Sequence, residues 1–431
     1  MKNTHDANLL QYTLDNGLRV VLQNCPGRAV TSAVINVRCG SQHESEQEAG
    51  FSHFVEHMLF KGTAKYSAKA ISSEVEKRGG MLNASTGHDV TSFYIRMPSI
   101  SQNIAFKFLA EIFFHPAFPQ KDLDKERNVV IEEINQIEDE PYQKLFAAGF
   151  KDIFGSHPLG RPIIGYEERI RTCTREQLKS YYHRYYTPTN SVLSIAGGLW
   201  KSDKEKNELI VQVEKYFNHT PVEGDTGFIF DTSKRPKAKF AKGIKKEHTK
   251  AGLAQSYFFV SLQGYERNLY NGFEIDAYER IVGQGMSSRL FQRIREKLGL
   301  CYHIAGLNYQ FNPKDSLFIA YGSSKASPER AIAAIIQELQ SSLETITKRE
   351  VADAITAILG KYEIDLDSVH FVANMNASDM LDFNQLRDHE KSKRLIAELT
   401  VEKVTAFMSK MWDSFKPTVI TLQPLKTEEA A

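Results

Sequence analysis

The predicted order of strands and helices in the first half of the chain returns in the second half. The first half is predicted to hold strands over 17–22 and 31–37, helices over 47–60 and 67–78, paired strands over 81–86 and 91–97, and helices over 101–114 and 120–138. The segment Pro-Thr-Asn-Ser-Val-Leu at 188–193 has an echo in Pro-Thr-Val-Ile-Thr-Leu at 417–422. A helix predicted over 273–282, followed by a hairpin around 312–315, repeats the order of 51–97 at an offset of about 220 residues. An offset of half the chain predicts two copies of one α+β unit.

Length and composition agree with two folded units. The chain has 431 residues, enough for two to three domains, each with a sizeable core. Hydrophobic residues make up 42% and charged residues 25%, which excludes a disordered or fibrous protein. The net charge is +1, so nucleic acid and anionic membranes are not expected partners.

Cysteine usage and the N-terminal segment bear on the compartment. Cys25, Cys39, Cys173 and Cys301 are far apart, which predicts free thiols in a reducing compartment. The N-terminal segment shows no apolar signal core, and no apolar run approaches the ~18 residues of a membrane helix. A cytoplasmic location without a membrane partner is therefore expected.

A polar stretch rich in Lys and Arg separates the two predicted copies. It runs over 223–250 and could serve as an anion-binding strip, but most charge runs are solvated segments. We therefore predict an N-terminal domain over 1–222, a linker over 223–250 and a C-terminal domain over 251–425.

The segment Phe-Ser-His-Phe-Val-Glu-His-Met at 51–58 carries the clearest chemical signal. On a helix His53 and His57 lie four residues apart on one face, where two imidazoles can take two sites of a tetrahedral zinc ion. Glu56 lies on the same side, within reach of a water at the metal, in the pattern HxxEH. The alternative is an ordinary pair of helix-face histidines, although partly buried imidazoles without a partner would be costly.

A catalytic zinc site needs a third protein ligand, and the acidic helix over 126–137 is the obvious source. Glu133 lies on a mixed apolar stripe, so its carboxylate needs a partner, whereas Glu132 falls on a polar stripe. Glu126 lies on the Glu133 stripe and is a candidate for the shell around the ligands. An acidic helix that is merely solvated remains the alternative.

With these residues in place, segment 51–63 resembles the signature of the pitrilysin/insulysin family of inverted-motif zinc peptidases. The resemblance is closest to the half-length branch that includes mitochondrial processing peptidase and its bacterial relatives. In that family the third ligand is a Glu about 76 residues after the second His, which implies Glu133, and a Glu seven residues earlier matches Glu126. Segment 82–86 resembles the family's edge strand, which implies that Asn83 and Ala84 bind substrate as an added strand.

The second half is similar to the family's C-terminal signature over 285–302. The resemblance implies that Arg295 and Tyr302 bind substrate backbone near the scissile bond; from residue type alone both would be structural. It also implies two similar domains, each a mostly antiparallel sheet with helices on one face, arranged as a clamshell. His43 and His88 lie in predicted loops and are expected to be surface residues rather than ligands.

Together these features predict a zinc metalloendopeptidase with one Zn²⁺ per chain, held by His53, His57 and Glu133. Glu56 would be the general base, and short or unfolded polypeptides would bind in extended form inside a chamber. A homodimer is expected because the chain is half the length of the family's single-chain enzymes. The alternatives are a non-catalytic scaffold or core-protein-like subunit of the same fold, and a metal-dependent hydrolase that acts on something other than peptides.

Overall fold

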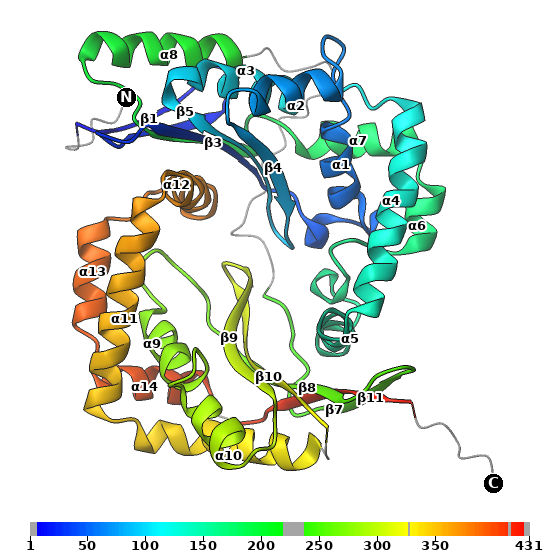
Figure 1. Cartoon of the computed structure of the whole chain (residues 1–431), viewed down its shortest axis with the longest axis vertical. Helices are drawn as coiled ribbons and strands as arrows, with labels where there is room; N and C mark the ends of the chain where they lie inside the picture. The colour runs from blue at the N-terminus through cyan, green and yellow to red at the C-terminus, as the bar shows by residue number, and fades with distance from the viewer. Residues whose placement is uncertain (1–6, 219–236, 326–327, 413–414, 426–431) are drawn as a thin grey trace. The chain divides into compact units, whose positions relative to one another are not determined.

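The computed structural model describes residues 7–218, 237–325, 328–412 and 415–425, and the chain divides into two units (Figure 1). Unit 1 comprises Met1–Ile134, Pro162–Arg235 and Glu363–Arg387. Unit 2 comprises Asn135–Arg161, Pro236–Tyr362 and Asp388–Ala431. Neither unit is continuous in sequence, because each takes a segment from the other half of the chain.

Unit 1 is built on a six-stranded sheet with the order β1-β2-β6-β3-β5-β4. Its strands are β1 (Leu9–Thr13), β2 (Arg19–Asn24), β3 (Val30–Val37), β4 (Met81–Thr86), β5 (Thr91–Pro98) and β6 (Ser191–Gly197). Only β2 and β6 pair in parallel. Strand β4 pairs with β5 alone, so it forms one edge of the sheet.

Unit 2 is built on a five-stranded sheet with the order β7-β11-β8-β10-β9. Its strands are β7 (Lys245–Lys250), β8 (Ser256–Gln263), β9 (His303–Asn312), β10 (Asp315–Ser324) and β11 (Thr418–Pro424). The order matches β2-β6-β3-β5-β4 strand for strand, including the one parallel pair, here β7 with β11. The two similar units, each with a mostly antiparallel sheet, are therefore confirmed.

Most of the helices also repeat in the same order, and α8 has no counterpart among the described helices of the second half. They are α1 (Phe51–Leu59), α2 (Ala68–Glu76), α3 (Gln102–Phe114), α4 (Gln120–Asp139), α5 (Pro141–Phe154), α6 (Glu167–Thr172), α7 (Arg175–Tyr185), α8 (Asp203–Phe217), α9 (Phe273–Val282), α10 (Pro328–Thr345), α11 (Lys348–Asp367), α12 (Val369–Phe383), α13 (His389–Ala397) and α14 (Val401–Met411). The corresponding helices α1 and α9 both start after a left-handed glycine, Gly50 at φ 96° and Gly272 at φ 88°. A Cβ on Gly50 would lie 2.5 Å from the carbonyl oxygen of Ile164, so no larger residue fits there.

Helix α12, from the second half of the chain, covers one face of the unit 1 sheet, and α3 lies on the other face (Figure 1). Val372 and Ala373 of α12 are buried in one apolar cluster with Val34 and Val192 of the sheet. The sequence predicts helices on one face only; the second face is also covered because it too is apolar.

Helix α5, from the first half of the chain, performs the same role in unit 2. Phe150 and Ile153 are buried in one cluster with Phe259 and Ile420 of the second sheet. At Gly149 a Cβ would lie 2.3 Å from the Phe259 ring, so the helix approaches this sheet closely. The two halves of the chain thus exchange one helix each.

The predicted linker lies partly outside the described residues, which omit 219–236. Its last six residues form β7, an edge strand that pairs in parallel with β11, rather than a solvated connection. The domain boundaries otherwise stay a prediction. All four cysteines are free, as the sequence predicts, and no described helix combines the length and apolarity needed to cross a membrane.

Candidate metal centre

Helix α1 separates an apolar face from a polar one. Its buried residues follow helical spacing and are Phe51, Ser52, Phe54, Val55, Met58 and Leu59. His53, Glu56 and His57 lie on the remaining face and are partly exposed. The core packing of α1 therefore fixes the direction in which the two imidazoles and the carboxylate point.

The start of α1 is held by a buried carboxylate. Glu44 is 3% exposed, and its two carboxylate oxygens accept hydrogen bonds from the backbone N–H groups of Gly50 at 2.9 Å and Ser52 at 2.8 Å. A negative charge at a helix N-terminus satisfies free N–H groups and is favoured by the helix dipole. Glu44 thereby anchors the turn that carries His53.

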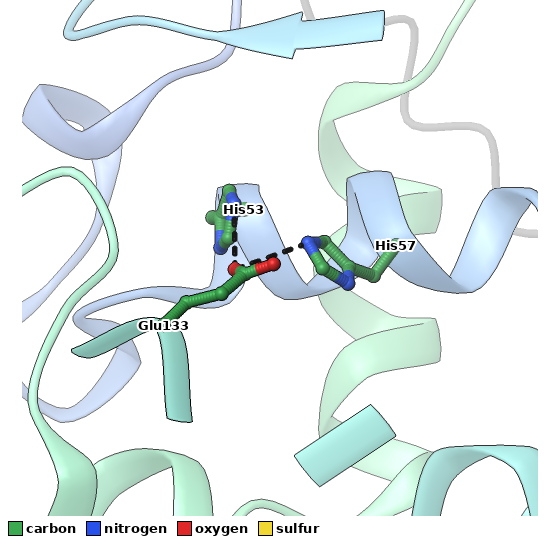
Figure 2. Close-up of side chains that lie close together, drawn as sticks. All are labelled: His53, His57 and Glu133. Carbon is green, nitrogen blue, oxygen red and sulfur yellow. Dashed lines mark ion pairs between the residues drawn. The ribbon is translucent and has the colours of Figure 1, made fainter. Parts of the chain in front are cut away.

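Glu133 reaches this face from α4, and the three side chains point toward one another (Figure 2). A Glu133 oxygen lies 3.7 Å from Nε2 of His53 and 3.5 Å from Nε2 of His57. The three possible ligand atoms all lie within 4.8 Å of one another. The structure therefore brings together the three residues that the sequence singles out as ligands.

The distances suit a single small cation. Ligands at ~2.05 Å from a tetrahedral zinc ion lie about 3.4 Å apart, close to the two measured N···O separations. Two imidazoles and a carboxylate form a donor set that zinc accepts, with one position left for water or substrate. His53, His57 and Glu133 could thus hold zinc without rearrangement of the backbone.

Glu126 orients one of the two imidazoles. Its carboxylate lies 3.0 Å from Nδ1 of His57, and its other oxygen lies 2.6 Å from Nζ of Lys61. A proton on Nδ1 of His57 leaves the lone pair of Nε2 directed at Glu133. Burial raises the pKa of Glu126, but one hydrogen bond from His57, one from Lys61 and the charge of Lys61 lower it by more, so this carboxylate stays ionised.

The two imidazoles differ in their affinity for protons. Burial, with a contribution from His57, lowers the pKa of His53 to about 4, so His53 is neutral at pH 7. Nδ1 of His53 is buried and meets no hydrogen-bond partner in the described part of the chain. Burial also lowers the pKa of His57, but the hydrogen bond to Glu126 and the charges of Glu133 and Glu56 raise it by a larger amount. The pKa of His57 is therefore above its usual value.

Glu56 is tied to the end of the edge strand β4. The Thr86 hydroxyl donates a hydrogen bond to the Glu56 carboxylate. Burial raises the pKa of Glu56, partly offset by Thr86 and His57, with a further upward contribution from Glu133. A carboxylate with a raised pKa, beside a metal-binding group, suits a general base.

Asn83 and Ala84 lie in the middle of β4. The side-chain oxygen of Asn83 accepts a hydrogen bond from the Ala84 backbone N–H at 2.8 Å. That N–H is therefore satisfied locally and would have to be released for an added strand. Their role in substrate binding stays a prediction.

Arg295 and Tyr302 belong to unit 2, and their role likewise stays a prediction. Arg295 lies on a π-helix over Phe291–Lys297, and its guanidinium lies 4.6 Å from the Phe291 ring and 5.3 Å from the Tyr302 ring. Tyr302 is 79% exposed. Irregular π-turns often occur at functional sites.

The two loop histidines are not surface residues, so that expectation is wrong. The side chain of His43 is 2% exposed and lies 3.4 Å from Asp89, while His88 is 6% exposed and bonds Ser41. Both serve a buried polar network rather than a metal. Glu132 is exposed, as its polar stripe predicts.

Sequence reasoning missed the supporting residues Glu44, Thr86 and Lys61. Each of these residues contacts a partner on another element or turn, and no spacing rule links the residue to that partner in the sequence. Only Lys61 could have been found from the sequence. It lies four residues after His57, so on a continued helix both side chains would be on the same side and could reach one carboxylate.

Comparison with known proteins identifies the family of the chain. Residues 19–167 match the model of the insulinase family of peptidases, M16, and residues 172–358 match the M16 inactive domain. A Bacillus subtilis protein described as the uncharacterized zinc protease YmxG is 32% identical over 90% of this chain and 91% of its own.

Solved structures share the fold. A protease from Helicobacter pylori has a TM-score of 0.85 at 22% identity, covering 96% of this chain and 99% of its own. An M16 inactive-domain protein from Pseudomonas fluorescens has a TM-score of 0.85 at 20% identity, covering 98% and 99%. The chain therefore belongs to the insulinase-type peptidases of family M16.

Proposed function

We propose that the protein is a zinc metalloendopeptidase that hydrolyses short or unfolded polypeptides. The observation that carries the proposal is the convergence of His53, His57 and Glu133 beside Glu56. Homologues described as zinc proteases support the same class of activity. A non-catalytic scaffold would have no use for three metal donors, an orienting carboxylate and a general base on adjoining elements.

In the proposed mechanism His53, His57 and Glu133 would hold one Zn²⁺ per chain. When bound, zinc polarises a carbonyl group and lowers the pKa of water. The Glu56 carboxylate removes a proton from the attacking water and later delivers it to the leaving amine. Thr86 holds Glu56 in place through its hydrogen bond, and Glu126 keeps the His57 ring in its working orientation.

We further propose that the substrate lies extended along β4. An edge strand can pair with one further strand, once the Ala84 N–H is released from the Asn83 side chain, and strand addition favours unfolded chains over folded ones. Asn83 and Ala84 would receive the substrate backbone, and Arg295 and Tyr302 would also bind it, as the family resemblance implies. Tyr302 would also donate a hydrogen bond to the developing oxyanion.

The test combines metal content with turnover in wild type and Glu56→Gln. Wild type should hold about one zinc per chain and cleave a mixed unfolded-peptide library in a chelator-sensitive way. Glu56→Gln should keep its zinc and lose at least about 10²-fold in kcat, because only the proton acceptor is removed. Glu132→Gln, on the exposed side of α4, is the matched control and should retain wild-type activity.

Full activity in Glu56→Gln would show that another group is the base. Zinc-free protein without cleavage would favour the scaffold.

We also propose a homodimer, because the chain is half the length of the family's single-chain enzymes. The zinc-binding set and the Arg295/Tyr302 pair occur together in this chain, so the partner would be a second copy rather than a different subunit. Light scattering of the active enzyme should give twice the 48.9 kDa chain mass. A strictly monomeric active enzyme would refute the dimer without affecting the zinc site.

A further inference from the structure

Unit 1 has a cavity that is separate from the candidate metal centre and lies at the end of β4 opposite to Glu56. It has a volume of about 460 Å³, and its lining includes Met81 at the start of β4 and Arg96 on the neighbouring strand β5. Met81 and Arg96 are direct partners in the sheet register, whereas Thr86, at the other end of β4, bonds Glu56. The cavity and the candidate metal centre therefore lie at the two ends of one exposed strand.

The lining carries an uncompensated positive charge. Two arginines and one aspartate face the cavity, and Arg28 is already paired with Asp367. Arg96 makes no ion pair within the described residues, and its Nε is buried without a hydrogen-bond partner. Within the described residues its one side-chain hydrogen bond is a weak one, from a terminal nitrogen to the Met81 sulfur at 3.3 Å. Because Nε is covered by protein atoms, a ligand in the cavity would meet the terminal nitrogens of Arg96, whose charge no carboxylate among the described residues pairs with.

The other walls would accept an extended chain. His370 contributes no charge of its own, because burial, with a contribution from Arg96, lowers its pKa. It is held by Ser32, whose hydroxyl lies 3.1 Å from Nδ1, and its ring packs at a tilt of 43° against the Tyr94 ring. Val30 and Met81 line the cavity and are 42% and 46% exposed. The start of α12 also lies near the cavity, but the Ser368 hydroxyl already accepts from the N–H of Phe371, so Arg96 is the donor that we assign to a ligand.

We propose that this cavity binds a carboxylate of the peptide substrate through Arg96. The carboxylate would come from an acidic side chain or from a free C-terminus. This inference rests on the proposed peptidase function and adds to it a specificity determinant. Met81 and Thr86 are five residues apart, about 17 Å along a strand, so the carboxylate should lie about five residues from the cleaved bond.

Binding to the inactive variant Glu56→Gln, loaded with zinc, tests the proposal without turnover. One peptide series is acetylated and amidated, with Glu replacing Gln at each of ten positions in turn. A second series has no acidic side chain but a free C-terminus at varied length. Fluorescence anisotropy should show one or two Glu positions that bind about tenfold more tightly than Gln. A preference limited to the second series would identify the terminal carboxylate as the source.

Substitutions at Arg96 then assign the preference. Arg96→Gln should bring the Glu-to-Gln affinity ratio close to one, Arg96→Lys should keep part of it, and Arg96→Glu should favour Lys at the same position. Arg171→Gln removes an arginine that is 57% exposed on α6 and should leave the ratio unchanged. The reversal in Arg96→Glu cannot arise from a damaged fold, so it remains informative if Arg96→Gln is unstable.

Equal binding of every Glu and Gln peptide, with no effect of a free C-terminus, would overturn the proposal. A preference for Glu over Gln peptides that persists in both Arg96→Gln and Arg96→Glu would also overturn the proposal. Hydrolysis by the wild-type enzyme is scored separately. Cleavage without any carboxylate preference would refute the carboxylate site at Arg96 but not the peptidase function. A carboxylate preference without cleavage would refute the peptidase function but not the carboxylate site.

Discussion

At the scale of single residues, the candidate metal centre depends on side chains that do not touch the metal position. Glu126 bonds Nδ1 of His57 and is itself neutralised by Lys61. Removal of such an orienting carboxylate typically weakens metal binding by about 10- to 100-fold.

We therefore expect Glu126→Gln to bind zinc about 10- to 100-fold more weakly than wild type, because a neutral amide holds the His57 tautomer less strongly. Competition against a chromophoric chelator measures this. Glu132→Gln, on the exposed side of the same helix, should bind zinc as wild type does. Equal affinities in both variants would mean that Glu126 does not orient His57.

The sequence predicts that His53, His57 and Glu133 form the site, because helical spacing and the family resemblance both point to these residues. His53 and His57 are four residues apart on one helix, so local geometry alone places them together. Thr86 is 30 residues from Glu56, and only the fold brings them together. The burial of His43 has the same cause, because its partner Asp89 comes from the turn between β4 and β5.

At the scale of elements, Arg38 connects the hairpin at the site to the exchanged helix α12. Its side chain is 3% exposed and pairs with Asp89 in the β4–β5 turn and with Asp382 of α12. It also donates to the carbonyl oxygen of Leu381 at 2.6 Å. The turn that follows Thr86 is thereby fastened to a helix from the other half of the chain.

Arg38→Met should lower the free energy of unfolding by about 3–5 kcal/mol, because it leaves two buried carboxylates without a cation. Thermal or urea unfolding measures this loss. Arg349→Met, at a side chain that is 92% exposed, is the control and should change stability by less than about 0.5 kcal/mol. A small loss in both variants would show that the Arg38 network is not tightly coupled.

Acid should loosen the element that precedes Arg295. Arg289 donates two hydrogen bonds to Glu350, at 2.6 and 2.8 Å, and lowers the pKa of Glu350 to about 2 from its usual 4.5. A lowered carboxylate pKa stabilises the fold above pH 4.5, and this stabilisation is lost as the pH falls toward 2.

Glu350→Gln should therefore be less stable than wild type by about 1–2 kcal/mol at pH 7, after allowance for solvent screening. The difference should shrink between pH 4.5 and pH 2. Urea titrations across this range measure it, and a difference that stays constant with pH would argue against the ion pair as its source.

Element boundaries follow closely from the sequence, but element partners do not. The strand predicted over 81–86 is observed over Met81–Thr86, and the helix predicted over 101–114 is observed over Gln102–Phe114. Apolar spacing shows that a helix has a buried face, but not which sheet covers it. The exchange of α5 and α12 was therefore not predictable from periodicity.

At the scale of the whole molecule, the exchange makes each half of the chain depend on the other. Residues 1–222 alone would leave the α12 face of the first sheet open, and residues 237–431 alone would lack α5. Separately expressed, each fragment should expose apolar surface and bind a hydrophobic dye strongly.

Co-expressed, the two fragments should elute together from a sizing column at the same volume as the intact protein and should bind little dye. Replacement of Val372 and Ala373 by aspartate in the second fragment should abolish this association, since both side chains are buried against the first sheet. Stable, dye-negative fragments on their own would show that the exchanged helices are dispensable.

The same exchange bears on how such a chain could have originated. Helices α4 and α11 start 228 residues apart, at Gln120 and Lys348, and so do α5 and α12, at Pro141 and Val369. The two exchanged helices are thus the same helix of two duplicated segments. A single ancestral segment would have had a bare sheet face and a helix with no surface to pack against. Two identical copies that exchange this helix cover both sheet faces and bury both helices. The ancestor would therefore have been a domain-swapped dimer before the two copies were joined in one polypeptide.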